Sequence, residues 1–209
     1  MSMYGKTDNL DEEIGKFPVS DCVSNVKVKK VEYYKEDAAD KKNYECIRIH
    51  YHRKVDNVLQ VFTEQTLPLN VDTILGWENG SQELVDEKAK EFNAKLLHVA
   101  KQYDVTKEEL QEKTMANSFA EFAQKYQNLL TPKLDDRLLY MKVMVNGSNY
   151  LETPKYPPFL QKMSTGDCTL SYSNYEKGLL AKHKSNVVAS SAIVEEDNDD
   201  ASFEDLLEN

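Results

Sequence analysis

The first third of the chain alternates between apolar and polar residues, which is the period of a β-strand. In residues 44–53, Ile47, Ile49 and Tyr51 fall on one side and are predicted to face the core. A turn at 55–57 then predicts a hairpin into a second strand. This part of the chain is therefore predicted to be β structure with one buried and one open face.

An earlier stretch shows the same alternation with a change of phase. Residues 26–29 alternate as Val-Lys-Val-Lys, and Val31 and Tyr33 continue the apolar positions after the phase has shifted by one residue. A single extra residue in a strand is the mark of a β-bulge. We therefore predict one long strand that is bulged or strongly coiled.

The apolar period changes to three and four residues after Gly80, which predicts a helical block over about 81–131. Ser81 is placed to cap a first helix, Thr106 opens a capping box for a second, and Ser118 begins a third that ends at Pro132. The lone Trp77 before the block is predicted to anchor the core or a hinge rather than to serve as a stacking surface.

Strands return after the helical block. Residues 139–145 alternate, and the Asn-Gly pair at 146–147 predicts a turn into a second hairpin. A proline-rich stretch at 153–160 is predicted to be stiff and extended, and 168–172 is predicted to be a last strand or turn. The residues expected to face inward are Leu139, Met141, Val143 and Val145, and those expected to face outward are Tyr140, Lys142 and Met144.

Strands, a helical block and further strands in this order predict an α+β fold built on a small antiparallel barrel. The OB-like barrel, with its helix before the fourth strand, fits this order, and the helical insertion at 81–131 is longer than usual for it. We expect one domain over 17–184, preceded by a flexible N-terminus at 1–16. A linker and a disordered acidic tail are expected over 185–209.

Charge separates the tail from the rest of the chain. The net charge of the 209 residues is −10, and the last fifteen residues carry eight acids and no base. Such a segment repels itself and has little apolar surface, so it is expected to be disordered. Two interpretations stay open: an arm that binds partner proteins, or a terminus that only aids solubility. The residues of this arm are Glu195, Glu196, Asp199, Asp200, Phe203, Leu206 and Leu207.

Positive charge gathers in the segments predicted to be strands. Residues 26–66 hold nine bases against seven acids and 137–184 hold seven against three, whereas the helical 72–136 hold eight against thirteen. An acidic protein with a basic sheet indicates one face for an anionic ligand.

Several classes of function lack their sequence signatures. No apolar run reaches the roughly 20 residues that span a bilayer, and residues 1–16 lack a signal-peptide pattern, so a cytoplasmic location is expected. In that reducing setting Cys22, Cys46 and Cys168 are expected to be free thiols. There is no phosphate-binding glycine loop and no nucleophile elbow, so we expect neither an enzyme nor a cofactor.

The outward side of 44–53 combines aromatic rings with cations, the combination that single-stranded nucleic acid needs for its bases and phosphates. The alternative is an ordinary solvent-facing sheet. His50 and His52 with Cys46 also raise the question of a metal site, but no further ligand stands at a metal-binding spacing, so none is expected. The candidate nucleic-acid contacts are Tyr44, Arg48, His50, His52, Arg53, Lys54, Tyr140, Lys142, Lys155 and Tyr156.

In its acidic tail, its β–helix–β order and the amino-acid sequence of residues 140–159, the chain resembles phage-encoded single-stranded DNA-binding proteins of the OB-fold kind. The resemblance spans roughly 17–175 in layout. It implies binding of single-stranded DNA (ssDNA) without sequence preference during replication, recombination or repair. It also implies recruitment of replication or recombination proteins through the tail, and places stacking residues at Tyr44, His50, Tyr140 and Tyr156.

The rival interpretation is a structural or packaged virion protein whose acidic tail serves assembly. The oligomeric state stays open, and a homo-oligomer is one option.

Overall fold

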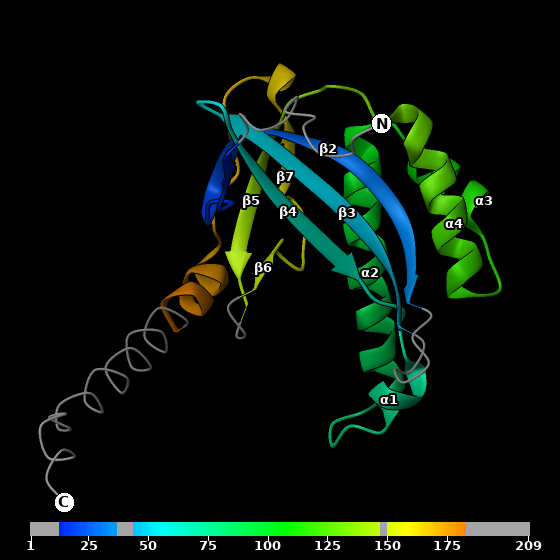
Figure 1. The fold of residues 1–209 in the computed structure, drawn as a ribbon. Coiled ribbons are helices and arrows are strands. Elements are labelled where there is room, and N and C mark those ends of the chain that lie inside the picture. Colours follow the sequence, from blue (N-terminus) through cyan, green and yellow to red (C-terminus); the bar gives the residue numbers. More distant parts are fainter. Residues whose placement is uncertain (1–12, 37–43, 147–149, 183–209) are drawn as a thin grey trace, which may run out of the picture.

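The computed structural model describes residues 13–36, 44–146 and 150–182, and its strands form one curved sheet (Figure 1). The order is β1-β4-β3-β2-β5-β6, with β7 paired to β5, and every pair except β1–β4 is antiparallel. The sheet makes a nearly closed barrel, as predicted. The strands are β1 Glu13–Gly15, β2 Ser20–Glu36, β3 Tyr44–Val55, β4 Val58–Thr66, β5 Leu139–Val145, β6 Leu151–Glu152 and β7 Leu160–Lys162.

The helical block lies between β4 and β5, where the sequence predicted it. The Ser81, Thr106 and Ser118 side chains each accept the backbone N–H three residues later, so all three predicted caps are confirmed. The elements are α1 Val71–Leu75, α2 Gln82–Gln102, α3 Lys107–Thr114, α4 Phe119–Leu130 and the short 3₁₀ turn η1 Thr131–Lys133, with a second turn η2 Met163–Thr165 after β7.

One core joins the barrel to the helices. The predicted inward residues Ile47, Ile49 and Tyr51 are buried against Leu96 of α2 and Tyr126 of α4. In Figure 1 the long strands β2, β3 and β4 cross in front of α2, while α3 and α4 stand at one side. The helices thus fill the concave side of the sheet and leave the outer side of β2–β4 open.

Two local predictions on the strands are confirmed. The pairing of β2 with β3 shifts between Val28 and Lys30, which is the bulge expected from the change of phase. The β3–β4 hairpin turns at Asp56 and Asn57, whose φ angles are +47° and +68°. Positive φ at both central residues matches the right-handed twist of the strands.

The seam between β4 and β6 is held by side chains. Glu64 points into the barrel, where one carboxylate oxygen accepts hydrogen bonds from the Lys95 ammonium and the Thr153 hydroxyl. The Glu64 side chain is almost fully buried. A buried carboxylate needs such partners, so this contact ties α2 and the segment after β6 to the barrel edge.

The cysteine prediction is wrong in part. Cys22 of β2 and Cys168 form a disulfide, with their Cα atoms 6.5 Å apart, whereas Cys46 is free and fully buried. The disulfide joins residues 146 positions apart in the chain. It fastens the segment after η2 to the outer side of the barrel.

Other differences lie near the ends of the domain. Glu13–Gly15, expected in a flexible N-terminus, form a strand beside β4. Residues 168–172 form no strand and lead into a helix over 174–182 that the sequence analysis did not predict. Trp77 is 49% exposed, so of its two predicted roles, an anchor of the core or of a hinge, the core role is wrong. The acidic tail lies outside the described residues.

No helix within 13–36, 44–146 and 150–182 is both long and apolar enough to cross a membrane.

Candidate nucleic-acid interface

The open outer side of β2, β3 and β4, here called the strand face, carries five of the predicted contact residues. Register places Glu32 of β2 and Gln65 of β4 on either side of Arg48, and Thr63 beside His50. Because side chains two residues apart share a face, each of the three strands contributes every second residue. The predicted residues on the strand face are Tyr44, Arg48, His50, His52 and Lys54.

An aromatic and cationic cluster occupies one end of the strand face. The Arg48 guanidinium carbon lies 3.2 Å from the centroid of the Tyr34 ring. Tyr34 and Tyr44 meet edge to face, with ring centroids 6.4 Å apart. Cys46 is buried, although it belongs to the same outer row. Stacked arginine and tyrosine side chains present flat surfaces on which nucleobases can stack.

The histidines of the strand face differ in their partners. His50 contacts Glu32 through Nε2 at 2.9 Å and the Thr63 hydroxyl through Nδ1 at 3.0 Å. Burial alone would raise the pKa of Glu32, but the contacts with Lys30 and His50 outweigh it and lower that pKa. Partial burial, with the charges of His50 and Lys29, lowers the pKa of His52. The charge of this face therefore depends on pH.

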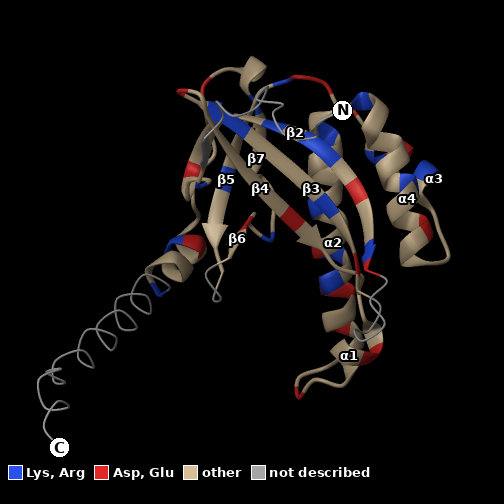
Figure 2. Cartoon of the chain, viewed as in Figure 1, with Lys and Arg blue, Asp and Glu red and all other residues tan. Residues whose placement is uncertain are grey.

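Lysines lie on the strand face from His50 toward the end opposite the cluster, as Figure 2 shows along β2 and β3. Lys27 pairs with Asp136 at 2.8 Å, and Lys30 pairs with Glu32. Lys29 and Lys54 are exposed. Exposed ion pairs of this kind are weak, so phosphates can compete for these lysines.

Arg53 does not join the strand face. It lies opposite Val26 and Gln60, on the inner side of the sheet at the end of the barrel. Its guanidinium donates to the Gln60 side chain at 3.4 Å. Neighbouring residues of a strand point to opposite sides, so Arg53 and Lys54, both candidate contacts at the end of this strand, do not share a face.

A groove continues the strand face past β4. It has a volume of about 590 Å³ and lies between β4 and the β5–β6 hairpin. Val61 and Gln65 belong both to the strand face and to this groove. Tyr150 stands at the groove with 71% of its surface exposed. An extended single strand of nucleic acid that crosses β3 and β4 would therefore reach the ring of Tyr150.

Lys142, Lys155 and Tyr156 gather elsewhere, at a cavity on the outer side of β5. The expectation that Lys142 faces solvent is wrong: it is 5% exposed, and its ammonium contacts both carboxylate oxygens of Glu176, at 3.2 and 3.1 Å. Residues after 168 cover this strand, which alternation within β5 could not reveal. Tyr140 is half-buried on the same outer side.

Members of the strand face that sequence reasoning missed include Glu32, Tyr34 and Thr63. The phase change in β2 was the signal for two of them, because once Val31 and Tyr33 point inward their neighbours must point outward. Thr63 lies opposite His50 by register, which depends on the length of the turn after β3.

The described residues contain no cluster of three or more His, Cys, Asp or Glu side chains that could hold a metal ion. No family model, curated protein or solved structure matches the chain. The geometry therefore has to support a function on its own.

Proposed function

We propose that this protein binds single-stranded DNA without sequence preference, in replication, recombination or repair. The strand face would hold the nucleic acid, with Tyr34, Tyr44 and Arg48 stacking on bases at one end and the lysines further along the face contacting phosphates. This is a binding function with no chemical step.

The observation that carries the proposal is the stack of Arg48 on Tyr34 beside Tyr44, on an open sheet lined by lysines. Every base has a π-face, so stacking surfaces accept any sequence. The acids Glu32 and Glu36 interrupt the positive charge of the face. Duplex DNA buries its bases, and we therefore expect a preference for single strands.

Salt tests the proposal directly. The protein should retard oligo-dT in a gel, oligo-dT should change the tyrosine fluorescence of the protein, and binding should weaken as salt rises. With about three neutralised phosphates at a slope of about −0.7 each, a fourfold rise in salt should weaken binding about 20-fold. A salt titration with constant affinity, or equal affinity for duplex DNA, would contradict the proposal.

Tyr44 offers a matched pair of variants. Tyr44→Ala is expected to weaken oligo-dT binding by about 1–3 kcal/mol, because it removes a stacking ring. Tyr44→Phe keeps the ring and loses only the contact of the hydroxyl with Gln65, so it should bind like the parent. Fluorescence titrations compare the three proteins. Equal binding by the alanine variant would show that this end of the strand face does not contact bases.

The acidic tail completes the proposal as an arm that recruits replication or recombination proteins. Eight acids tethered to the body also compete with DNA for the lysines at a high effective concentration. Truncation before Glu195 should therefore strengthen oligo-dT binding, most at low salt, where charges are screened least. Titrations at two ionic strengths measure this, and unchanged affinity at both would leave the tail no role in DNA binding.

A further inference from the structure

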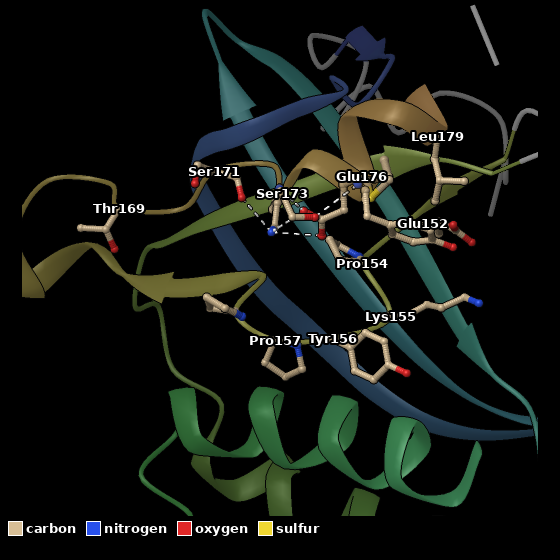
Figure 3. A pocket seen from close by; sticks show the side chains of 14 residues that line it. Glu152, Pro154, Lys155, Tyr156, Pro157, Thr169, Ser171, Ser173, Glu176 and Leu179 are labelled. Carbon is tan, nitrogen blue, oxygen red and sulfur yellow. Dashed lines mark hydrogen bonds and ion pairs between the residues drawn. The ribbon is translucent and has the colours of Figure 1, made fainter. Parts of the chain in front are cut away.

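The cavity on the outer side of β5, here called the aromatic cavity, has a volume of about 350 Å³. In Figure 3 the helix with Glu176 and Leu179 lies above it, and the segment with Pro154, Tyr156 and Pro157 lies below. Lys142 of β5 contributes to its lining. Its size is that of pockets that hold small organic ligands.

Two exposed tyrosines line the aromatic cavity. Tyr156 is 52% exposed and Tyr175 is 67% exposed. The Tyr156 hydroxyl donates to Glu91 of α2 at 2.8 Å and to Glu87 at 3.2 Å. These carboxylates raise the pKa of Tyr156 to about 12, and the two hydrogen bonds hold the hydroxyl in position. The ring is thus oriented before any ligand arrives, which lowers the entropy cost of stacking.

The charges of the cavity lining balance. Lys142 is neutralised by Glu176, and the remaining charged residues of the lining are Lys155 and Glu152. Pro154 and its neighbouring prolines add apolar surface. A balanced lining gives little attraction for a phosphate group, whereas flat rings and apolar walls suit an uncharged aromatic ligand.

The cavity lies close to the strand face. β5 pairs directly with β2, which pairs with β3. However, β5 pairs with residues 20–26 of β2 and β3 with residues 26–36, so the cavity does not lie beside β3. It meets the strand face through the groove past β4, because Glu152 lines both the cavity and that groove, and Val61 and Gln65 of the strand face line the groove. A single strand of DNA that runs across β4 into this groove therefore arrives beside the cavity, and its bases are unpaired.

We propose that the aromatic cavity receives one unpaired nucleobase of the bound strand, with Tyr156 and Tyr175 as stacking surfaces. This inference rests on the proposed function and assigns a second kind of contact to it. The strand face supplies salt-dependent contacts with phosphates, and the cavity supplies a contact with a base that does not depend on salt.

The experiment uses the full-length chain with Tyr156→Ala and Tyr175→Ala, each beside its phenylalanine counterpart. Each alanine variant should bind oligo-dT about 5- to 150-fold more weakly, the equivalent of about 1–3 kcal/mol for one stacked base. The slope of affinity against salt should stay that of the parent, because no cation is lost. The phenylalanine variants keep the rings and should bind nearly as well as the parent.

A strand of abasic residues of the same length separates base from phosphate contacts. The alanine variants and the parent should bind it equally. In the unaltered protein, oligonucleotides with bromodeoxyuridine should photo-crosslink to Tyr156 or Tyr175, as peptide mass spectrometry would show. This second measurement does not depend on a variant that folds.

Parent-like oligo-dT binding by both alanine variants, or crosslinks confined to β2–β4, overturns the inference and leaves the proposed function standing. A parent protein that fails to bind oligo-dT overturns both.

Discussion

Replacing Lys142 by Met is expected to lower the free energy of unfolding by about 3 kcal/mol, because it leaves the Glu176 carboxylate without its cation in a site that is nearly closed to water. The Lys142 ammonium also donates to the Ser171 carbonyl at 3.0 Å. Burial would raise the pKa of Glu176, yet hydrogen bonds from Ser173 and the contact with Lys142 lower it. Removing Lys142 takes away one of the groups that stabilise the charged carboxylate, while the cost of its burial remains.

Urea denaturation of three variants measures how much of this loss in the free energy of unfolding comes from the ion pair itself. Glu176→Leu should lower the free energy of unfolding by a similar amount, because it leaves a buried ammonium without its carboxylate. The double variant should lose much less free energy of unfolding than the two single variants together, since neither charge is then left without its partner. Lys113→Met is the matched control on the surface. Its partner Glu109 also pairs with Lys133, so the loss should stay below about 0.5 kcal/mol. Additive losses in the double variant would contradict an energetic role for the pair.

The pair matters for the site as well as for stability. It fastens the helix over 174–182 to β5, together with the Cys22–Cys168 disulfide. That helix forms one wall of the aromatic cavity. A loss of the pair would therefore loosen the cavity before it affected the strand face.

Features that depend on neighbouring residues could be predicted from the sequence. Ile47, Ile49 and Tyr51 were placed in the core by alternation alone, and the caps at Ser81, Thr106 and Ser118 by residue type. Each of these signals lies within a few residues of the feature it predicts. The barrel followed from the order of the elements.

Features that depend on distant residues could not be predicted. Alternation placed Lys142 correctly on the outer row of β5, but not the segment that covers it some thirty residues later. The stack of Arg48 on Tyr34 needed the register between β2 and β3 across a bulge. The aromatic cavity combines β5, the proline-rich segment and the last helix, so no single stretch of sequence carries its signal.

His98 of α2 is a second buried polar contact, and it depends on pH. Its Nε2 accepts the backbone N–H of Leu160 at 3.0 Å and that of Phe159 at 3.2 Å, and its ring contacts Phe159 with centroids 4.6 Å apart. The Leu160 carbonyl oxygen also lies 3.1 Å from this nitrogen, but two N–H groups against one carbonyl favour the ring with Nε2 unprotonated. The neutral ring thus holds the start of β7 against α2.

Acidification from pH 7 to pH 5 is expected to destabilise the protein by about 2 kcal/mol through His98 alone. Burial is the main cause that lowers the pKa of His98 to about 4, whereas the unfolded chain titrates near 6.5. Between these values the unfolded state binds the proton and the folded state does not, so stability falls as pH falls through 6.5 and levels off below 4. The total loss approaches about 3 kcal/mol.

The matched variant is His98→Gln, whose side-chain oxygen can accept the same N–H groups without titrating. Its free energy of unfolding should vary less between pH 7 and pH 5 than that of the parent, by about 2 kcal/mol, although it starts lower at pH 7. The pH dependence of stability that remains in the variant comes from His52, whose pKa is also lowered, and from the other titrating groups. Urea denaturation at pH 7, 6 and 5 gives both slopes, and equal slopes would show that His98 is protonated in the folded protein.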